Sequence, residues 1–95
     1  MNLYLVTRQD AIKYDEYDSM VVTAENEESA THISPDDYHK WEAGNWYEYY
    51  ADGTKQLVEY FHVWPADIST LKVVLLGTAV EGTQEGKILT SFNAG

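Results

Sequence analysis

Cysteine is absent from this chain of 95 residues. Its absence excludes a disulfide framework, thiolate metal sites and thiol nucleophiles, and it is typical of proteins that work in a reducing compartment. No stretch approaches the roughly 18 apolar residues of a membrane span, and the apolar run near the N-terminus is too short for a signal-peptide core. We therefore expect a soluble, cytoplasmic protein whose fold depends on packing alone.

Basic residues are scarce as well. The chain has 6 Lys and Arg against 16 Asp and Glu, which gives a formal net charge of −10. This surplus argues against direct binding of nucleic acid through its phosphates and against docking on anionic membranes. Most of the carboxylates lie in residues 1–52. Basic surfaces of other proteins are the expected partners.

Apolar residues make up 44% and aromatic residues 14% of the chain, enough to build one packed core. The length leaves no room for two self-sufficient cores, so we predict a single domain over residues 1–95. Apolar and β-forming residues predict strands at 2–8, 19–24, 70–79 and 86–93. The first and third of these are apolar enough to be buried, and the first two are expected to pair.

The middle of the chain contains a helix signal and a hairpin signal. Asn26 is a good N-cap, with two glutamates in the first turn after it, and Pro35 ends this short helix. The segment 34–44 reads equally well as a helical turn or as an ordered loop. Asp52-Gly53 predicts a two-residue turn between two aromatic arms, the second ending at Pro65, with Tyr50 opposite Lys55 or Tyr49 opposite Gln56.

The order of these elements predicts an α+β fold: a mostly antiparallel sheet of about five to six strands, with one short α-helix on one face.

The chain matches no pattern that carries chemistry. The acidic stretch fails the calcium-loop spacing, the three histidines lack zinc-ligand spacing, and there is neither a nucleophile elbow nor a phosphate-binding glycine loop. We predict no enzyme, no catalytic residue, no cofactor and no metal site. A loose divalent-cation site involving Asp15 and Asp18 stays open as an alternative.

Carboxylates and aromatic rings are the residues that could carry binding. The stretch "YDEYDS" and the start of the predicted helix could form one negative surface that imitates a row of phosphates. The aromatic hairpin needs one face for the core, and its other face could bind a protein. The predicted partner-binding residues are Asp15, Glu16, Asp18, Glu25, Glu27, Glu28, Tyr14, Tyr17, Trp46, Tyr47 and Tyr49.

The segments "MNLYLVTR", "YDEYDSMVVTAENEESA", "VVLLGTAVEG" and "GKILTSFNAG" resemble a family of small, mostly uncharacterised bacteriophage and prophage proteins. The resemblance covers the general layout and transfers no site residue. It implies a phage accessory product in the bacterial cytoplasm, similar in class to small acidic inhibitors of host defence. We therefore expect an anti-CRISPR or anti-restriction type of inhibitor, acting as a DNA mimic on a basic nucleic-acid-binding complex. The alternative is a virion or assembly component that self-associates through a sheet edge or an aromatic face.

Overall fold

The computed structural model describes residues 1–10, 12 and 14–93. Over these residues the chain forms seven strands, one α-helix and one 3-10 helix. In chain order they are β1 (Asn2–Arg8), β2 (Glu16–Ala24), α1 (Glu27–Thr31), β3 (His39–Glu42), β4 (Asn45–Tyr49), β5 (Lys55–Leu57), η1 (Ile68–Thr70), β6 (Leu71–Thr78) and β7 (Gly86–Asn93). None of the helices in this described part is long and apolar enough to cross a membrane.

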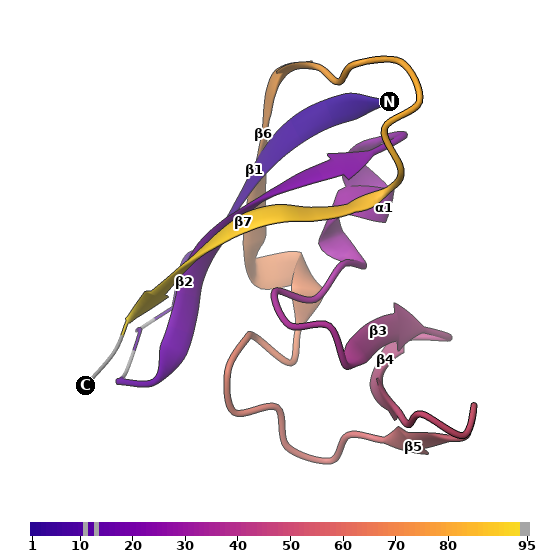
Figure 1. The fold of residues 1–95 in the computed structure, drawn as a ribbon. Coiled ribbons are helices and arrows are strands. Elements are labelled where there is room, and N and C mark those ends of the chain that lie inside the picture. The colour runs from indigo at the N-terminus through magenta and orange to yellow at the C-terminus, as the bar shows by residue number, and fades with distance from the viewer. Residues whose placement is uncertain (11, 13, 94–95) are drawn as a thin grey trace.

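The strands form two antiparallel sheets (Figure 1). The first has the order β6-β1-β2-β7, and the second has the order β3-β4-β5. The predicted α+β class with mostly antiparallel pairing is confirmed, but the single sheet is wrong. The second hairpin arm ends at Leu57 and is followed by an irregular segment over 58–67, so β4 and β5 never reach the strands of the first sheet.

The four strands of the first sheet lie where the sequence predicts strands, and the one predicted pairing, of the first two, is observed. β7 has the predicted bounds, β1 and β2 pair as expected, and β2 begins three residues earlier than predicted. The prediction of a buried strand at 70–79 is wrong, because β6 is an edge strand with several exposed side chains. An apolar run does not distinguish a buried strand from an exposed apolar edge.

The helix begins as the sequence predicts. The Asn26 side chain accepts a hydrogen bond from the Ser29 amide at 2.8 Å, and the helix places Ala30 in the core. The following segment is an ordered loop, in which the Asp36 carboxylate accepts from the amides of Tyr38 and His39 at 2.9 and 3.1 Å. Of the two open readings for 34–44, the ordered loop is observed only over residues 34–38. Neither reading predicted the strand β3 that occupies residues 39–42.

The core lies on one side of the four-stranded sheet, facing α1 and the second sheet (Figure 1). Two tryptophans from the aromatic half of the chain fill it, and the Trp46 indole N–H donates to the carbonyl of Pro65 at 3.0 Å. The buried apolar residues are Tyr4, Val6, Met20, Val22, Ala24, Ala30, Trp46 and Trp64. The opposite side of the sheet receives neither the helix nor the second sheet.

The register between β4 and β5 is shifted by one residue from the predicted one, in which Tyr50 faces Lys55 and Tyr49 faces Gln56. Tyr49 faces Lys55, because the connection spans residues 50–54 instead of two residues. Asp52 stabilises this wider loop by accepting from the Thr54 amide at 2.9 Å, and Gly53 takes the positive φ of 87° that glycine favours. The predicted arm reaching to Pro65 is wrong, and His62 lies in the irregular segment, stacked edge-on against Tyr60.

Candidate functional site

The turn between β1 and β2 carries the densest acidic stretch, and we call residues 14–18 the acidic tip. Tyr14 is 75% exposed there, so its ring is available to a partner. Asp15 adopts a left-handed conformation with φ 61°, which aspartate tolerates better than most residues. Its amide donates to the carbonyl of Asn93 at 2.6 Å, which fixes the tip to the end of β7.

Internal contacts orient two further carboxylates of the acidic tip. Asp18 accepts from the hydroxyls of Ser19 and Ser91 at 2.8 and 3.1 Å. The Glu16 carboxylate lies 3.9 Å from the guanidinium of Arg8, whose side chain is almost completely buried. These contacts hold the carboxylates in defined positions, as preorganised binding groups are held.

Arg8 lies next to the acidic tip and pairs with Asp10. The guanidinium donates to both oxygens of Asp10, at 2.6 and 2.8 Å, in the two-pronged geometry that suits arginine and a carboxylate. This hydrogen-bonded pair lowers the pKa of Asp10 below its usual value. The only arginine of the chain is therefore occupied inside the molecule.

The second acidic group lies at the start of α1. Glu25, Glu27 and Glu28 are all exposed there. Residues 19–24 of β2 separate this group from the acidic tip, a distance of about 23 Å from Asp18 to Glu25 at about 3.3 Å per residue. The expected single surface is therefore wrong: the two groups lie at opposite ends of one strand (Figure 1).

The predicted aromatic anchors differ widely in exposure. Trp46 is only 3% exposed and belongs to the core, so it is not an anchor. Tyr17 is half-buried and packs edge-on against Phe92, with ring centroids 4.8 Å apart. Tyr14 is the predicted anchor with the most accessible ring.

Tyr47 and Tyr49 lie on the side of β4 that faces away from Trp46, and the protein's own charges contact them. Lys55 stands 4.7 Å from the Tyr47 ring centroid, and Lys40 stands 4.9 Å from that of Tyr49. The Tyr49 hydroxyl donates to Glu42, which also pairs with Lys55 at 3.0 Å. These bonds lower the pKa of Glu42 and raise the pKa of Tyr49 and of Lys55.

These five residues form what we call the tyrosine face. The sequence predicted that Tyr47 and Tyr49 are accessible, but it did not predict their contacts with Lys55 and Lys40. The signal was present in the correct strand register, which puts Lys40 opposite Tyr47 and Tyr49 opposite Lys55. The rings are thus already engaged in cation–π contacts.

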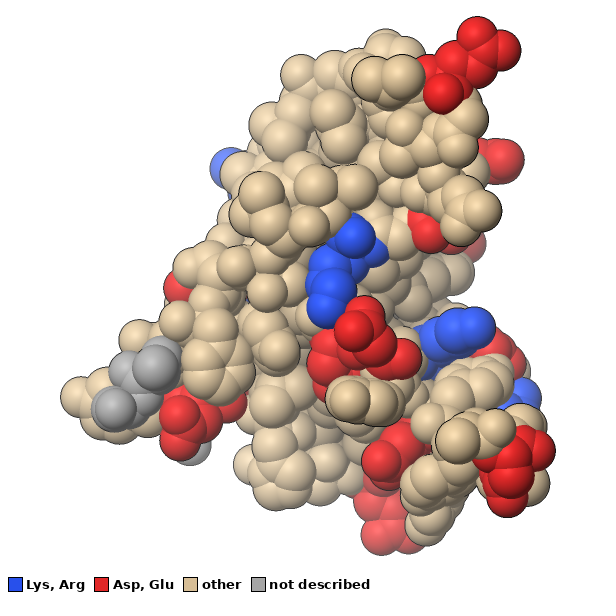
Figure 2. Space-filling model, viewed as in Figure 1, with Lys and Arg blue, Asp and Glu red and all other residues tan. Residues whose placement is uncertain are grey.

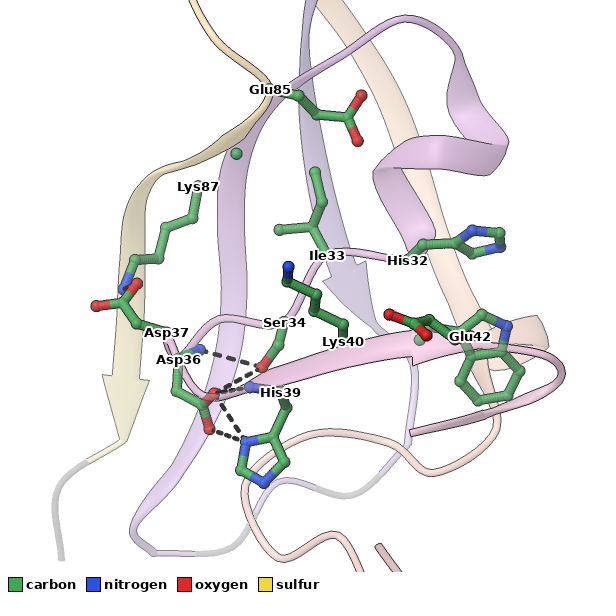
Figure 3. Close-up of a pocket in the computed structure, with 12 residues that line it drawn as sticks. His32, Ile33, Ser34, Asp36, Asp37, His39, Lys40, Glu42, Glu85 and Lys87 are labelled. Carbon is green, nitrogen blue, oxygen red and sulfur yellow. Dashed lines mark hydrogen bonds and ion pairs between the residues drawn. The ribbon is translucent and has the colours of Figure 1, made fainter. Parts of the chain in front are cut away.

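An open cleft of about 500 Å³ lies between β3 and the start of β7 (Figure 3). Lys87 of β7 reaches Asp37 of the loop before β3, with an N–O distance of 3.1 Å. Charges of both signs line the cleft, including Lys40, Glu42 and Glu85. Sequence reasoning missed it because it joins segments that are more than forty residues apart.

A histidine and a carboxylate pair beside this cleft without forming a nucleophilic site. His39 Nδ1 lies 2.7 Å from Asp36, and the Ser34 hydroxyl also donates to Asp36, at 3.1 Å. The serine is therefore bonded to the acid and not to the histidine that would have to activate it. The His39 ring and the Lys40 side chain leave β3 on opposite sides (Figure 3). Asp36 serves as the organiser of its own loop.

The described residues contain no group of three or more His, Asp or Glu side chains placed to hold a metal ion. Asp15 and Asp18 therefore have no third ligand among the residues outside the gaps at 11, 13 and 94–95.

Figure 2 shows carboxylates at the acidic tip, around the three-stranded sheet, at the upper right and beside a basic side chain near the centre of this face. Comparison with family models, curated proteins and solved structures finds no match to this chain. The resemblance to phage proteins therefore stays a hypothesis, and function has to be argued from the surfaces themselves.

Proposed function

We propose that this chain is a non-enzymatic binding protein of phage type, which inhibits a host nucleic-acid-handling complex by occupying its basic surface. Such a complex would be a CRISPR effector or a restriction enzyme, and the site of action the bacterial cytoplasm. One observation carries the proposal: three basic side chains in the described part of the chain are paired within the molecule. Arg8 pairs with Asp10, Lys55 with Glu42 and Lys87 with Asp37, so these cations are held by carboxylates of their own chain and the net charge of −10 stays uncompensated.

The size of the charge decides what kind of mimicry is feasible. A DNA duplex as long as the protein's longest dimension, 35 Å, carries about 20 phosphate charges. The net charge of −10 is about half of that. This field is strong enough to steer the protein to a basic groove, but affinity and choice of target need local contacts as well.

The acidic tip supplies such contacts in this proposal. It combines three carboxylates with the exposed ring of Tyr14, and aromatic rings are frequent anchors in protein interfaces. The glutamates at the start of α1 lie too far away to meet the same few basic residues. They are assigned to a second contact region on the same partner or to steering.

Affinity capture from a lysate of CRISPR- and restriction-containing bacteria tests this function. Tagged protein is compared at low and moderate salt, with and without competing duplex DNA, and the retained proteins are identified by mass spectrometry. We expect one nucleic-acid-binding complex, retained less at higher salt and displaced by DNA. Retention of no such complex would contradict the proposal.

Charge-neutral variants then locate the surface. One carries Asp15→Asn, Glu16→Gln and Asp18→Asn, and a second carries Glu25→Gln, Glu27→Gln and Glu28→Gln. The control neutralises three exposed carboxylates elsewhere, through Glu59→Gln, Glu81→Gln and Glu85→Gln. All three variants have the same net charge, so a larger loss with the tip variant than with the control assigns the contact to the tip. Equal losses of binding in the tip variant and the control would show that only net charge matters and would contradict a contact at the tip.

The alternative function, a self-associating virion or assembly component, also has one observation in its favour. β6 and β7 are edge strands of the first sheet, and neither edge pairs with another strand in residues 1–10, 12 and 14–93. Open-ended pairing through such edges gives assemblies that grow with concentration. Sedimentation velocity separates this function from inhibition, because a growing series of sizes supports it and a single defined species contradicts it.

A further inference from the structure

The side of the four-stranded sheet that faces away from the core carries an apolar row across its middle, and we call this side the outer face. Residues on β1 alternate between the two sides: Tyr4 and Val6 are buried in the core, whereas Leu3 and Leu5 point outward. In the described part of the chain, neither the helix nor the second sheet covers this outer face (Figure 1).

A row of four apolar side chains crosses the outer face from edge to edge. Strand register places Val74 beside Leu5, Leu5 beside Val21, and Val21 beside Leu89. The outer members are well exposed, Val74 at 39% and Leu89 at 58%. An ordered apolar row of this kind resembles the inner face of a β-sandwich more than the surface of a monomer.

The next row toward the acidic tip is polar and carries one charge of each sign at its ends. Lys72 lies at the β6 edge beside Thr7, and it forms no ion pair among the described residues. At the β7 side, Ser19 and Ser91 hold the carboxylate of Asp18 on the outer face. The outer face therefore has its positive group at one edge and a negative group near the other.

We propose that a second copy of this chain covers the outer face, related to the first by a two-fold axis parallel to the strands. Such an axis keeps each row at its own level and exchanges the two edges. Leu89 of one copy then lies over Val74 of the other, and Lys72 of each copy lies over Asp18 of the other. The apolar rows pack at the ordinary sheet-to-sheet spacing of about 10 Å.

Charge and area both favour a second copy as the occupant. Lys72 and Asp18 supply the charge complementarity: they lie on the outer face near opposite edges, so two copies can pair them twice, and the apolar row beside them carries no charge. The exposed side chains of Val74 and Leu89 and the partly exposed side chains of Leu5 and Val21 provide the apolar part of the contact area, and the polar row adds to it, toward the roughly 800 Å² per partner of a stable interface. Each chain carries both the positive group at one edge and the negative group near the other, so two identical copies can satisfy each other.

Sedimentation equilibrium of the purified protein alone, over a range of micromolar concentrations, tests the dimer. We expect a monomer–dimer equilibrium that closes at two copies, and Leu89→Glu should weaken it more than about tenfold because a charge would be buried in the apolar row. Val80→Glu is the matched control: Val80 is 82% exposed in the loop after β6, so the same charge change should leave dimerisation unaltered. A monomer at every concentration, or equal weakening by both variants, overturns the proposal.

A charge exchange tests the two-fold axis itself. Lys72→Glu and Asp18→Lys should each weaken dimerisation about tenfold, and the double variant, which restores the wild-type net charge, should recover most of it. Recovery requires the two positions to meet across the interface, so its absence overturns the axis. Thermal unfolding of each variant verifies folding, and Val74→Glu provides a second disruption of the row. These experiments use the purified protein without any host protein, so a negative result would contradict the dimer and leave the proposed inhibition untouched.

Discussion

The two faces of the four-stranded sheet are built from neighbouring rows of residues, yet they have opposite roles. The inner row runs from Val73 through Val6 and Met20 to Thr90, and its two central side chains are 0% and 1% exposed. The outer row, one residue away on every strand, is as apolar but leaves its ends open to solvent. Composition therefore does not decide which face is core. The helix and the tryptophans on one side decide it.

The largest expected difference between the faces is in folding stability. Met20→Ala removes buried side-chain volume from the inner row and should lower the free energy of unfolding by about 3 kcal/mol. Leu89→Ala on the outer face should lower it by less than about 1 kcal/mol. Urea unfolding followed by circular dichroism, at concentrations that keep the chain monomeric, measures both. Similar losses would erase the distinction between a core face and an interface.

Two tryptophans, Trp46 and Trp64, pack against the inner face, and substituting each one tests its contribution to stability. Trp46 donates its N–H to Pro65, whereas the buried N–H of Trp64 has no hydrogen-bond partner among the described residues. Both lose similar volume on conversion to phenylalanine, but only Trp46→Phe leaves a carbonyl without its donor. We expect Trp46→Phe to be more destabilising than Trp64→Phe by about 1 kcal/mol, measured by urea unfolding. The reverse order would assign the larger contribution to indole packing.

The inner face ends at Arg8, whose pair with Asp10 makes stability depend on pH. The pKa of Asp10 is lower in the folded chain than its unfolded value of about 3.9. Its contribution is therefore complete above that unfolded value and disappears as pH falls through the folded pKa. Because Asp10 is partly exposed, Asp10→Asn should cost about 1 kcal/mol or less at neutral pH and nothing in strong acid. Glu59→Gln is the control, and unfolding at several pH values is the measurement.

The smallest effect is expected on the outer face of the monomer. Val74→Thr keeps the branched shape that suits a strand and exchanges a methyl group for a hydroxyl on an exposed edge. Monomer stability should change by less than about 0.5 kcal/mol. The same variant should weaken the proposed dimer measurably, so a stability curve at low concentration and a sedimentation series at high concentration should disagree. If Val74→Thr changed neither monomer stability nor dimerisation, Val74 would not belong to the interface.

Local signals account for the parts of the fold that were predicted well. Asn26 as an N-cap, the strand at 86–93 and the pairing of β1 with β2 all depend on residues close in sequence. The two-sheet arrangement depends on where the second hairpin arm stops, and nothing in the apolar run from Leu57 to Trp64 indicates an end at Leu57. For the same reason, the predicted strand position of His62 was wrong.

The candidate site divides in the same way. The exposed carboxylates and Tyr14 were identified from the sequence, because charged residues in a turn seldom have anywhere to go but the surface. Their separation into two groups required the length and direction of β2. The burial of Trp46 and the lysine contacts of the tyrosine face required the register of a hairpin whose loop is wider than its Asp-Gly signal indicates.

The sequence by itself determined an acidic α+β chain with one arginine, no thiol chemistry, an apolar first strand and a turn dense in carboxylates. These properties follow from residue types and short-range spacing. The tertiary structure alone decided which sheet face became core, which tryptophans became buried and which carboxylates share a surface. Each of these depends on contacts between segments distant in the chain, and local propensity carries no information about which of two equally apolar faces those segments will cover.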